Sequence, residues 1–301
     1  MYINPYEKVR TGSGSWLRSN FHTHAGTGKD TCGANTIDDV VASYKEAGYE
    51  VLMISNHDLV TDTREQISKN DILMISGYEY SKENRHMLCI GVQGKAVLGE
   101  PEDAIENCRK QNGLVMLCHP NWIKKEYWPW SLLESMKGYA GIEIFNSVIF
   151  RLSGSGLATD TWDHLLSQGK LVWGFGNDDF HRWFDMAKAW NMIYAEERTE
   201  AAVLEALRRG SFYVSTGLFL NEISFDGRRI SVSASSLNTY VNTNQYIFTG
   251  RSGEILKEQN GAFGEYELRG DETYVRVQVI SEHGAMLWTQ PIYHEELRPA
   301  W

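Results

Sequence analysis

Residues 16–24 read Trp-Leu-Arg-Ser-Asn-Phe-His-Thr-His, a short strand-like run that ends in two histidines. From this stretch to about residue 195, short apolar runs alternate with amphipathic stretches. Such alternation is typical of parallel strands joined by crossover helices, and seven or eight repeats of it favour a closed barrel over an open sheet. The expected strands are 16–22, 50–55, 71–76, 86–92, 114–118, 141–145, 171–175 and 189–194.

Helix signals lie between several of these runs. Thr36 can cap a helix with Asp39 three residues on, and Gly48 follows the end of this helix. Further helices are expected over Glu102–Asn112 and Thr159–Gln168, each followed by a glycine. The alternation of strands and helices predicts an α/β fold.

The chain changes character after about residue 195. One more helix is expected over Glu200–Arg209, and a hairpin signal follows at Asp226-Gly227. We expect short antiparallel strands over 219–224, 229–233, 245–249, 266–268 and 274–281. The sequence therefore predicts a barrel unit over residues 1–195 and a helix plus a small antiparallel β module over residues 196–301.

Composition argues against several classes of protein. The 301 residues are 42% hydrophobic and 23% charged, which is ordinary for a globular chain. No apolar run approaches the roughly 18 residues of a membrane span. Residues 1–20 lack the layout of a signal peptide, so we expect a cytoplasmic protein without a membrane partner. The net charge of −10 argues against a nucleic-acid duplex as partner, and the sequence does not indicate the oligomeric state.

Six of the nine histidines track the expected strands, most of them at strand ends. In a βα barrel the carboxyl ends of the strands converge on one face. Residues two apart on a strand point to the same side, so His22 and His24 can bind one ion together. The candidate metal ligands are His22, His24, His57, His86, His119 and His181, joined by Glu79 and Asp179.

These ligand types indicate which ions the site would bind. Imidazole and carboxylate suit zinc, manganese or iron better than calcium or copper(I). Eight or nine ligands exceed the needs of one ion, so we expect two or three divalent ions that share a bridging carboxylate, with Glu79 as the candidate bridge. Such a site can lower the pKa of water and clamp the oxygens of a phosphoryl group, which predicts a hydrolase.

The ordered motifs also resemble a known family, the PHP (polymerase and histidinol phosphatase) superfamily of metal-dependent phosphoesterases. The match covers roughly residues 20 to 182 and rests on His22-Thr23-His24, Asn56-His57-Asp58, Gly77-Tyr78-Glu79, His86, His119-Pro120 and Asp179-Phe180-His181. The resemblance implies a distorted seven-stranded, TIM-like β/α barrel with up to three ions. It implies a first ion on His22, His24, Glu79 and Asp179, a second on Glu79, His86 and His119, and a third on His57, His181 and a loop residue.

The loop after His24 departs from the family pattern. The family places an acid or a histidine before a glycine here, and this sequence has Cys32-Gly33. Asp30, two residues earlier, can supply the carboxylate if the loop is displaced, and we narrowly favour Asp30 over Cys32 as the ligand. A third interpretation is that the third ion site is weak or empty.

Other charged residues flank the expected ligands. Lys29, Arg85 and Arg182 are candidates for binding the phosphate of a substrate. Asp58, beside His57, is a candidate to relay a proton to the leaving oxygen or to orient a ligand. The role of Asp178, next to Asp179, stays open.

The sequence thus predicts a phosphatase or phosphodiesterase that acts on a small phosphorylated substrate. Two alternatives remain: an amidohydrolase-like enzyme that hydrolyses C–N or carboxyl-ester bonds, and a protein that binds ions without turnover. A lysine or arginine that points into the site would favour a phosphate ester, because guanidinium and ammonium groups bind phosphate.

The metal content of the purified protein tests this interpretation first. We expect about two or three transition-metal ions per chain by elemental analysis, because the site offers more ligands than the four that one zinc ion uses. Less than about half an ion per chain, even after reconstitution with zinc, manganese or iron, would contradict the metal-site prediction.

Overall fold

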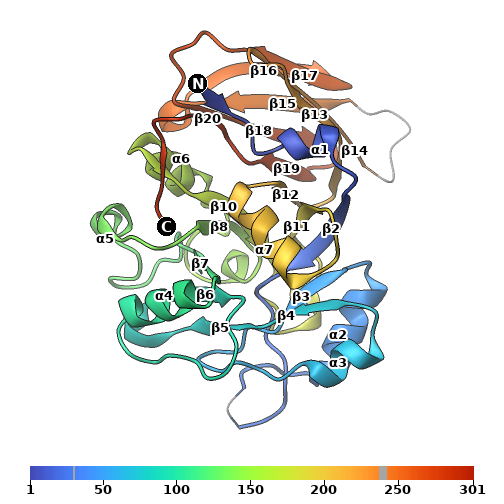
Figure 1. Cartoon of the computed structure of the whole chain (residues 1–301), viewed down its shortest axis with the longest axis vertical. Coiled ribbons are helices and arrows are strands. Elements are labelled where there is room, and N and C mark those ends of the chain that lie inside the picture. Colours follow the sequence, from blue (N-terminus) through green and yellow to red (C-terminus); the bar gives the residue numbers. More distant parts are fainter. Residues whose placement is uncertain (30, 237–242) are drawn as a thin grey trace.

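The computed structural model describes residues 1–29, 31–236 and 243–301 (Figure 1). Its strands lie in four sheets, and the largest has eleven strands in the order β1-β20-β18-β19-β12-β11-β2-β3-β4, with β15 beside β18 and β16 beside β15. These strands are β1 (Tyr2–Ile3), β2 (Ser15–Asn20), β3 (Val51–Met53), β4 (Leu73–Ile75), β11 (Trp190–Ala195), β12 (Phe212–Ser215), β15 (Asn244–Thr249), β16 (Ile255–Gly261), β18 (Tyr274–Ser281), β19 (Met286–Thr289) and β20 (Ile292–His294).

A second sheet of five strands has the order β10-β8-β7-β6-β5. Its members are β5 (Gly77–Tyr80), β6 (Met87–Ile90), β7 (Leu114–Leu117), β8 (Gly141–Asn146) and β10 (Trp173–Asn177). A three-stranded sheet holds β13 (Leu218–Phe225), β14 (Arg229–Ser236) and β17 (Phe263–Glu267), and β9 (Lys170–Leu171) pairs with β21 (Arg298–Pro299).

Helices and 3-10 turns connect these strands. The helices are α1 (Glu7–Thr11), α2 (Ile37–Glu46), α3 (Arg64–Lys69), α4 (Pro101–Lys110), α5 (Trp130–Ser135), α6 (Thr159–Ser167) and α7 (Glu200–Arg209). The 3-10 turns are η1 (Lys82–Asn84), η2 (Val148–Arg151), η3 (Trp183–Asp185) and η4 (Arg251–Gly253). Within the described residues, no helix is long and apolar enough to cross a membrane.

Each strand expected before residue 196 is present, with small shifts at its ends. The mixed α/β character is present too. The strand directions differ from the expectation of parallel strands: β2–β3–β4 and β7–β8–β10 are parallel, whereas β5–β6–β7 and β2–β11–β12 are antiparallel. The antiparallel β5–β6 pair arises from β5, which the sequence reasoning missed: Gly-Tyr-Glu-Tyr follows β4 directly, and a short turn joins it to β6.

Isolated bridges connect the eleven-stranded and the five-stranded sheets next to the histidine motifs. Thr23, after β2, pairs in parallel with Phe180, after β10. His57, after β3, pairs in parallel with Glu79 in β5. These contacts place the ends of β2, β3, β5 and β10 together, and the closed seven-stranded barrel stays a prediction.

The local signals read from the sequence form the expected caps and turns. The Thr36 hydroxyl accepts a hydrogen bond from the backbone N–H of Asp39 at 3.1 Å and caps α2. The Asp226 carboxylate accepts from the backbone N–H of Arg228 and of Arg229 at 2.9 and 2.7 Å, which closes the β13–β14 hairpin. The antiparallel pairing expected after residue 195 is confirmed for β13, β14, β15, β17 and β18.

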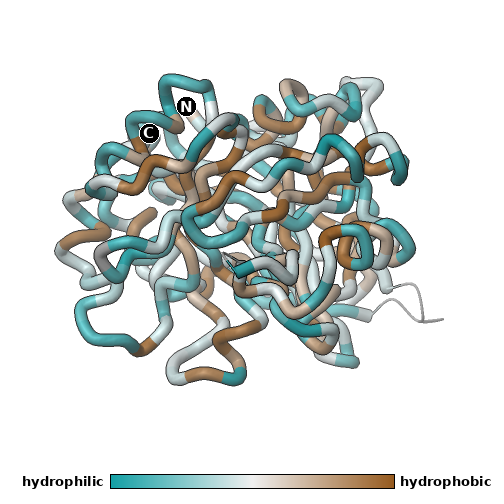
Figure 2. The backbone as a smooth tube through the Cα atoms, turned by 90° about the horizontal axis from the view of Figure 1, so that it is seen from below, coloured by the Kyte–Doolittle hydropathy of each residue, from teal (hydrophilic) through white to brown (hydrophobic). Residues whose placement is uncertain are grey.

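The C-terminal strands lie at one end of the molecule, and α2, α3 and α4 lie towards the other end (Figure 1). The hydrophobic residues gather along interior segments, and most outer loops are hydrophilic (Figure 2). β12 and β19 extend the sheet of β2 and β11 into the C-terminal part, so strands from both sides of residue 195 share one sheet. The division into units 1–195 and 196–301 stays a prediction.

A buried ion pair joins the two parts of the chain. Arg276 of β18 donates to both carboxylate oxygens of Asp163 in α6, at 2.7 and 2.5 Å, and the Tyr274 hydroxyl donates to the same carboxylate at 3.0 Å. The side chains of Arg276 and Asp163 are only 4% and 7% exposed. Since the pair is shielded from water, each charge is stabilised by its partner and not by solvent.

Removal of one partner should therefore destabilise the fold. We expect Arg276→Ala to lower the free energy of unfolding by about 3–5 kcal/mol in urea denaturation, because it leaves the Asp163 carboxylate buried without its cation. Lys110→Ala removes an exposed pair with Glu106 and serves as the control, which should barely move the midpoint. Equal midpoints for the two variants would show that the buried pair does not hold the parts together.

Candidate metal centre

The backbone after β2 brings the first two histidines to the end of the five-stranded sheet. The His24 N–H donates to the Phe180 carbonyl at 2.9 Å, and the Phe180 N–H donates to the His22 carbonyl at 3.3 Å. On the other side, the side chain of Asn56 bonds both the N–H and the carbonyl of Ala25, at 3.1 and 2.8 Å. The histidines are therefore fixed between the ends of β10 and β3.

Two imidazoles and two carboxylates meet at the bottom of this site. His22 Nε2 lies 3.3 Å from Glu79 Oε2 and 3.2 Å from Asp179 Oδ1. His24 Nε2 lies 3.2 Å from the same Glu79 oxygen and 3.3 Å from the same Asp179 oxygen. The structure thus brings together the four residues that the family resemblance implies for a first ion.

The atoms that face one another here lack hydrogen bonds. Within the described residues, His22 Nε2, His24 Nε2 and Glu79 Oε2 are buried and have no hydrogen-bond partner. A buried polar atom without a partner costs free energy, and three that converge on one point need a shared partner. A divalent cation fits this donor set of two imidazoles and two carboxylates.

The two carboxylate oxygens of Glu79 face different imidazoles. Oε2 faces His22, His24 and also His57, whose Nδ1 lies at 2.9 Å. Oε1 lies 2.8 Å from His86 Nδ1 and 3.7 Å from His119 Nε2. This arrangement is the one expected of a carboxylate that bridges two ions.

The described residues contain four overlapping groups whose ligand atoms all lie within 4.8 Å of one another. They are His22 with His24 and Asp179, His57 with Glu79 and His86, His22 with Glu79, Cys118 and His119, and His24 with Cys32, His57 and His181. The overlap supports more than one ion. It also places the Cys32 thiol among the histidines, whereas Asp30 lies outside the described residues.

Several site residues adopt a backbone conformation that is rare outside glycine. The φ angles of Asp58, His119 and Asp179 are 55°, 31° and 52°. Positive φ in a residue with a side chain costs on the order of 1–3 kcal/mol and persists where the surroundings enforce it. The strain at His119 and Asp179 falls on two expected ligands.

Sequence reasoning missed Glu143, which lies in the middle of β8. Its Oε1 is 2.8 Å from His22 Nδ1, and its Oε2 accepts from the His119 N–H and from Asn146 Nδ2, both at 2.8 Å. This carboxylate orients His22 so that Nε2 faces the centre. The available signal was an acid inside the apolar run Gly-Ile-Glu-Ile-Phe, because a buried acid needs partners.

Two further residues orient ligands and were also missed. The Tyr127 hydroxyl lies 2.9 Å from His119 Nδ1, which leaves Nε2 of that ring to face Asp179 and Glu79. The Asp185 carboxylate accepts from the backbone N–H of His181 at 3.1 Å and of Arg182 at 3.0 Å. No local pattern marks either residue, since each lies on a loop outside the expected strands.

Asp58 and Asp178, whose roles the sequence left open, form their hydrogen bonds outside the histidine cluster. Asp58 accepts from the backbone N–H and the hydroxyl of Ser81, at 2.9 and 2.7 Å, and pairs with Lys82 at 3.1 Å. Asp178 is buried and accepts from the Tyr44 hydroxyl at 2.7 Å and from backbone N–H groups of residues 187–189. Burial raises the pKa of Asp178 to about 6, although these hydrogen bonds act in the opposite direction and lower it. In the structure, both side chains stabilise the loops that carry the ligands.

A cavity of about 310 Å³ opens over the cluster. Among the described residues, its lining includes Arg182 but neither Lys29 nor Arg85. Arg85 donates instead to the backbone carbonyl groups of Asn84 and Glu126, and Lys29 is exposed. Arg151 also lines the cavity and was not anticipated. The lining comprises Cys32, His57, Glu79, His86, His119, Trp122, Val148, Ile149, Arg151, Leu152, Asp179, His181 and Arg182.

The charged groups of the cluster shift one another's pKa values. Burial raises the pKa of the Glu79 carboxyl, but the neighbouring histidines outweigh this effect and hold that pKa well below its usual range. Burial lowers the pKa of His22, but the charges of Asp179 and Glu143 outweigh this effect and raise it well above 6.5. Ligand histidines must be neutral to bind a cation, so we expect the affinity for ions to fall as the pH falls.

Comparison with known proteins adds information on the fold. No family model matches the sequence, and no curated protein matches it. A crystal structure described as a two-domain protein containing a predicted PHP-like metal-dependent phosphoesterase, from Bacteroides vulgatus ATCC 8482, is similar at a TM-score of 0.54. This chain shares its fold. The match covers 89% of this chain and 90% of that one at 17% identity, so it shows a common fold and agrees with the PHP resemblance of the motifs.

A second solved structure is only weakly similar. It is native alpha-2-macroglobulin from Escherichia coli, spanning domains NIE-MG1, with a TM-score of 0.21, 8% identity, and 34% and 48% of the two chains covered.

The bridging role of Glu79 can be tested by substitution. We expect Glu79→Gln to retain the fold, to lose most bound metal and to lose nearly all hydrolytic activity, because a neutral amide cannot offer two anionic oxygens to two ions. Elemental analysis and thermal unfolding measure the first two effects.

His164→Ala is the matched control for this substitution. The His164 ring lies away from the cavity, 2.7 Å from the Glu134 carboxylate and with its centroid 3.8 Å from that of Trp130. The His164→Ala variant should keep its metal and stay within about a few-fold of the parent activity, which corresponds to a change of under about 1 kcal/mol in the activation barrier. Equal losses in both variants would mean that the site is elsewhere.

Proposed function

We propose that this chain is a metal-dependent hydrolase of small phosphate esters, a phosphatase or phosphodiesterase. The observation that carries the proposal is the convergence of the histidine–carboxylate cluster and two guanidinium-bearing side chains, Arg151 and Arg182, on one cavity. The likeness in fold to a PHP-like protein supports the same reaction class, and the residues of the cluster supply the chemical argument.

The arginines favour a phosphate ester over the alternative substrates. Guanidinium groups match phosphate oxygens in charge and in planar geometry. Arg151 is held in place by Asp185, at 3.1 and 3.0 Å, and remains 41% exposed. An uncharged amide or carboxyl ester would gain little from these cations. The two arginines therefore favour a phosphoesterase over the amidohydrolase-like alternative.

The cluster provides ligands for zinc, manganese or iron, and two or three such ions would supply a water of lowered pKa and neutralise charge on the phosphoryl group. Glu79 holds the two groups of histidines at a fixed separation, and Glu143 keeps the His22 ring aligned. Arg182 binds and orients the phosphate at the wall of the cavity. The side chains of Ile149 and Leu152 form part of the cavity lining.

The shape of the cavity also indicates the kind of ester. Its volume of about 310 Å³ is at the lower end of small-molecule pockets, which favours a compact substrate. Trp122, Val148, Ile149 and Leu152 form an apolar part of the wall. We expect this wall to accommodate a ring or another apolar part of the alcohol that leaves.

A substrate screen tests the reaction class. We expect phosphate release or diester cleavage on a panel of nucleotides, sugar phosphates and a chromogenic diester, dependent on manganese, zinc or iron and abolished by a chelator. Cleavage of amides or carboxyl esters by metal-loaded protein, without any phosphate release, would favour the amidohydrolase-like alternative. Full metal loading without any turnover would favour the other alternative, a protein that binds ions without catalysis.

The phosphate-binding role of Arg182 has its own test. We expect Arg182→Ala to lower kcat/KM for the best phosphate ester by about 10- to 100-fold, the loss of one charge-assisted hydrogen bond, with the metal content unchanged. Arg251→Ala, on the exposed turn η4, is the control and should be neutral. An unchanged kcat/KM in Arg182→Ala would remove Arg182 from the substrate site.

A further inference from the structure

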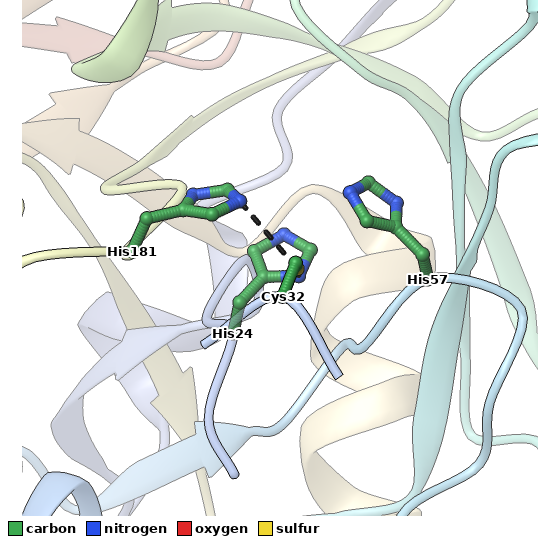
Figure 3. A group of neighbouring side chains, drawn as sticks. All are labelled: His24, Cys32, His57 and His181. Atoms are coloured by element: carbon green, nitrogen blue, oxygen red, sulfur yellow. Dashed lines mark hydrogen bonds between the residues drawn. The ribbon is translucent and has the colours of Figure 1, made fainter. Parts of the chain in front are cut away.

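The loop after His24 carries a thiol into the cluster (Figure 3). Cys32 Sγ lies 3.2 Å from His24 Nδ1 and 3.6 Å from His181 Nε2. His57 completes the group, and the four ligand atoms all lie within 4.8 Å of one another. In Figure 3 the rings of His181, His24 and His57 surround the side chain of Cys32.

The loop itself fixes where this thiol lies. The Gly26 N–H donates to the Asn35 carbonyl at 2.8 Å, and the Thr31 hydroxyl donates to the Gly26 carbonyl at 2.7 Å. Gly33 packs so closely on Ala25 that an added Cβ would lie 2.7 Å from the Ala25 Cα. Only glycine allows this approach, and it brings the preceding residue, Cys32, over His24.

The second nitrogen of each neighbouring ring indicates its role. His24 Nε2 faces Glu79 and Asp179, so this nitrogen is the one that would bind an ion. His24 Nδ1 then carries the proton, which it donates to the sulfur of Cys32. His181 Nδ1 lies 2.8 Å from the Asp179 carbonyl and is the donor there. The lone pair of His181 is therefore on Nε2, on the side of the thiol.

We propose that Cys32, as a thiolate, binds one divalent ion together with His57 and His181, while His24 donates a hydrogen bond to its sulfur. This inference rests on the proposed metal-dependent function and specifies the chemistry of one of its ion sites. It names Cys32 as the loop ligand, whereas Asp30, which the sequence narrowly favoured, lies outside the described residues. Three protein ligands with one open position are the usual complement of a catalytic zinc ion.

The sulfur ligand sets the preference of this site for metals. Thiolate is a soft ligand that favours zinc, whereas manganese prefers oxygen ligands. The other groups of the cluster combine imidazole with carboxylate and accept manganese or iron as well. The centre therefore contains one site that selects zinc beside sites that are less selective, and His24 links them because its two nitrogens face different groups.

Cobalt binding tests this assignment without measuring turnover. Cobalt(II) replaces zinc readily, and a thiolate ligand gives it an intense near-ultraviolet charge-transfer absorption. We expect titration of metal-free protein with cobalt(II) to produce this absorption in the parent and in Cys108→Ala, whose thiol is buried away from the cluster. Cys32→Ser should lose the absorption and about one bound ion per chain.

The other outcomes of the titration separate this inference from the proposed function. Binding of two or more cobalt ions without the absorption, in parent protein, would overturn thiolate ligation and leave the metal-dependent function intact. An absorption that survives in Cys32→Ser and disappears in Cys118→Ala would assign the ligand to Cys118 and overturn it too. Failure to bind any cobalt, zinc or manganese would overturn both proposals.

Thiol modification gives a second, independent measurement. Cys32 is the exposed one of the four free cysteines, so iodoacetamide should label it selectively in metal-free protein. A ligand thiolate is not available to the reagent, so we expect stoichiometric zinc to slow labelling of Cys32 by about tenfold or more, by mass spectrometry of its peptide. Manganese should protect it much less. Equal labelling rates with and without zinc would contradict ligation by Cys32.

Discussion

The buried Glu79 carboxylate, which faces two groups of imidazoles, organises the metal centre of this chain. Its two oxygens face His22, His24 and His57 on one side and His86 and His119 on the other. A buried carboxylate among histidines is stable only when its charge is balanced. The loops after β2 and β3 carry His22, His24 and His57, which face this carboxylate of β5, and the loop after β10 carries Asp179, which faces His22 and His24.

Several features serve to hold this carboxylate and its partners in place. The imidazoles of His22, His119 and His181 each have one nitrogen fixed by a group outside the cluster, namely Glu143, Tyr127 and the Asp179 carbonyl. Each of these contacts leaves the opposite nitrogen to face the cluster. The positive φ angles of His119 and Asp179 show that the chain tolerates local strain to present these two ligands. The mouth of the site is formed by loops and short turns that carry the arginines and the apolar wall.

Much of this arrangement could be predicted from the sequence. Strands are short apolar runs, and the histidine motifs follow them, so the convergence of His22, His57 and Asp179 follows from parallel strands alone. The strand β5 was missed because Gly-Tyr-Glu-Tyr is short and contains a charged residue in place of an apolar one. For the same reason Glu143, an acid inside an apolar strand, was overlooked. Both acids lie in strands because their partners are the buried imidazoles: Glu79 faces the cluster directly, and Glu143 bonds the opposite nitrogen of His22.

What the sequence could not determine depends on loop geometry. Arg85 and Arg182 both adjoin an expected ligand, yet only Arg182 reaches the cavity, because the turn before β6 directs Arg85 towards the Glu126 carbonyl. Spacing alone could not place Cys32 beside His24 and His181, since the position of a loop residue depends on the close packing of Gly33 on Ala25. Arg151 comes from a turn far away in the sequence, and no local pattern relates it to the histidines.

We propose above all that Glu79 bridges two ions in one buried centre. Anomalous diffraction from crystals grown with zinc or manganese is the sharpest test, because it locates each ion relative to the carboxylate. We expect at least two anomalous peaks, each within coordination distance of a different Glu79 oxygen, about 2.0–2.2 Å for zinc. A single peak bound by one oxygen, or ions found only on surface acids, would contradict it.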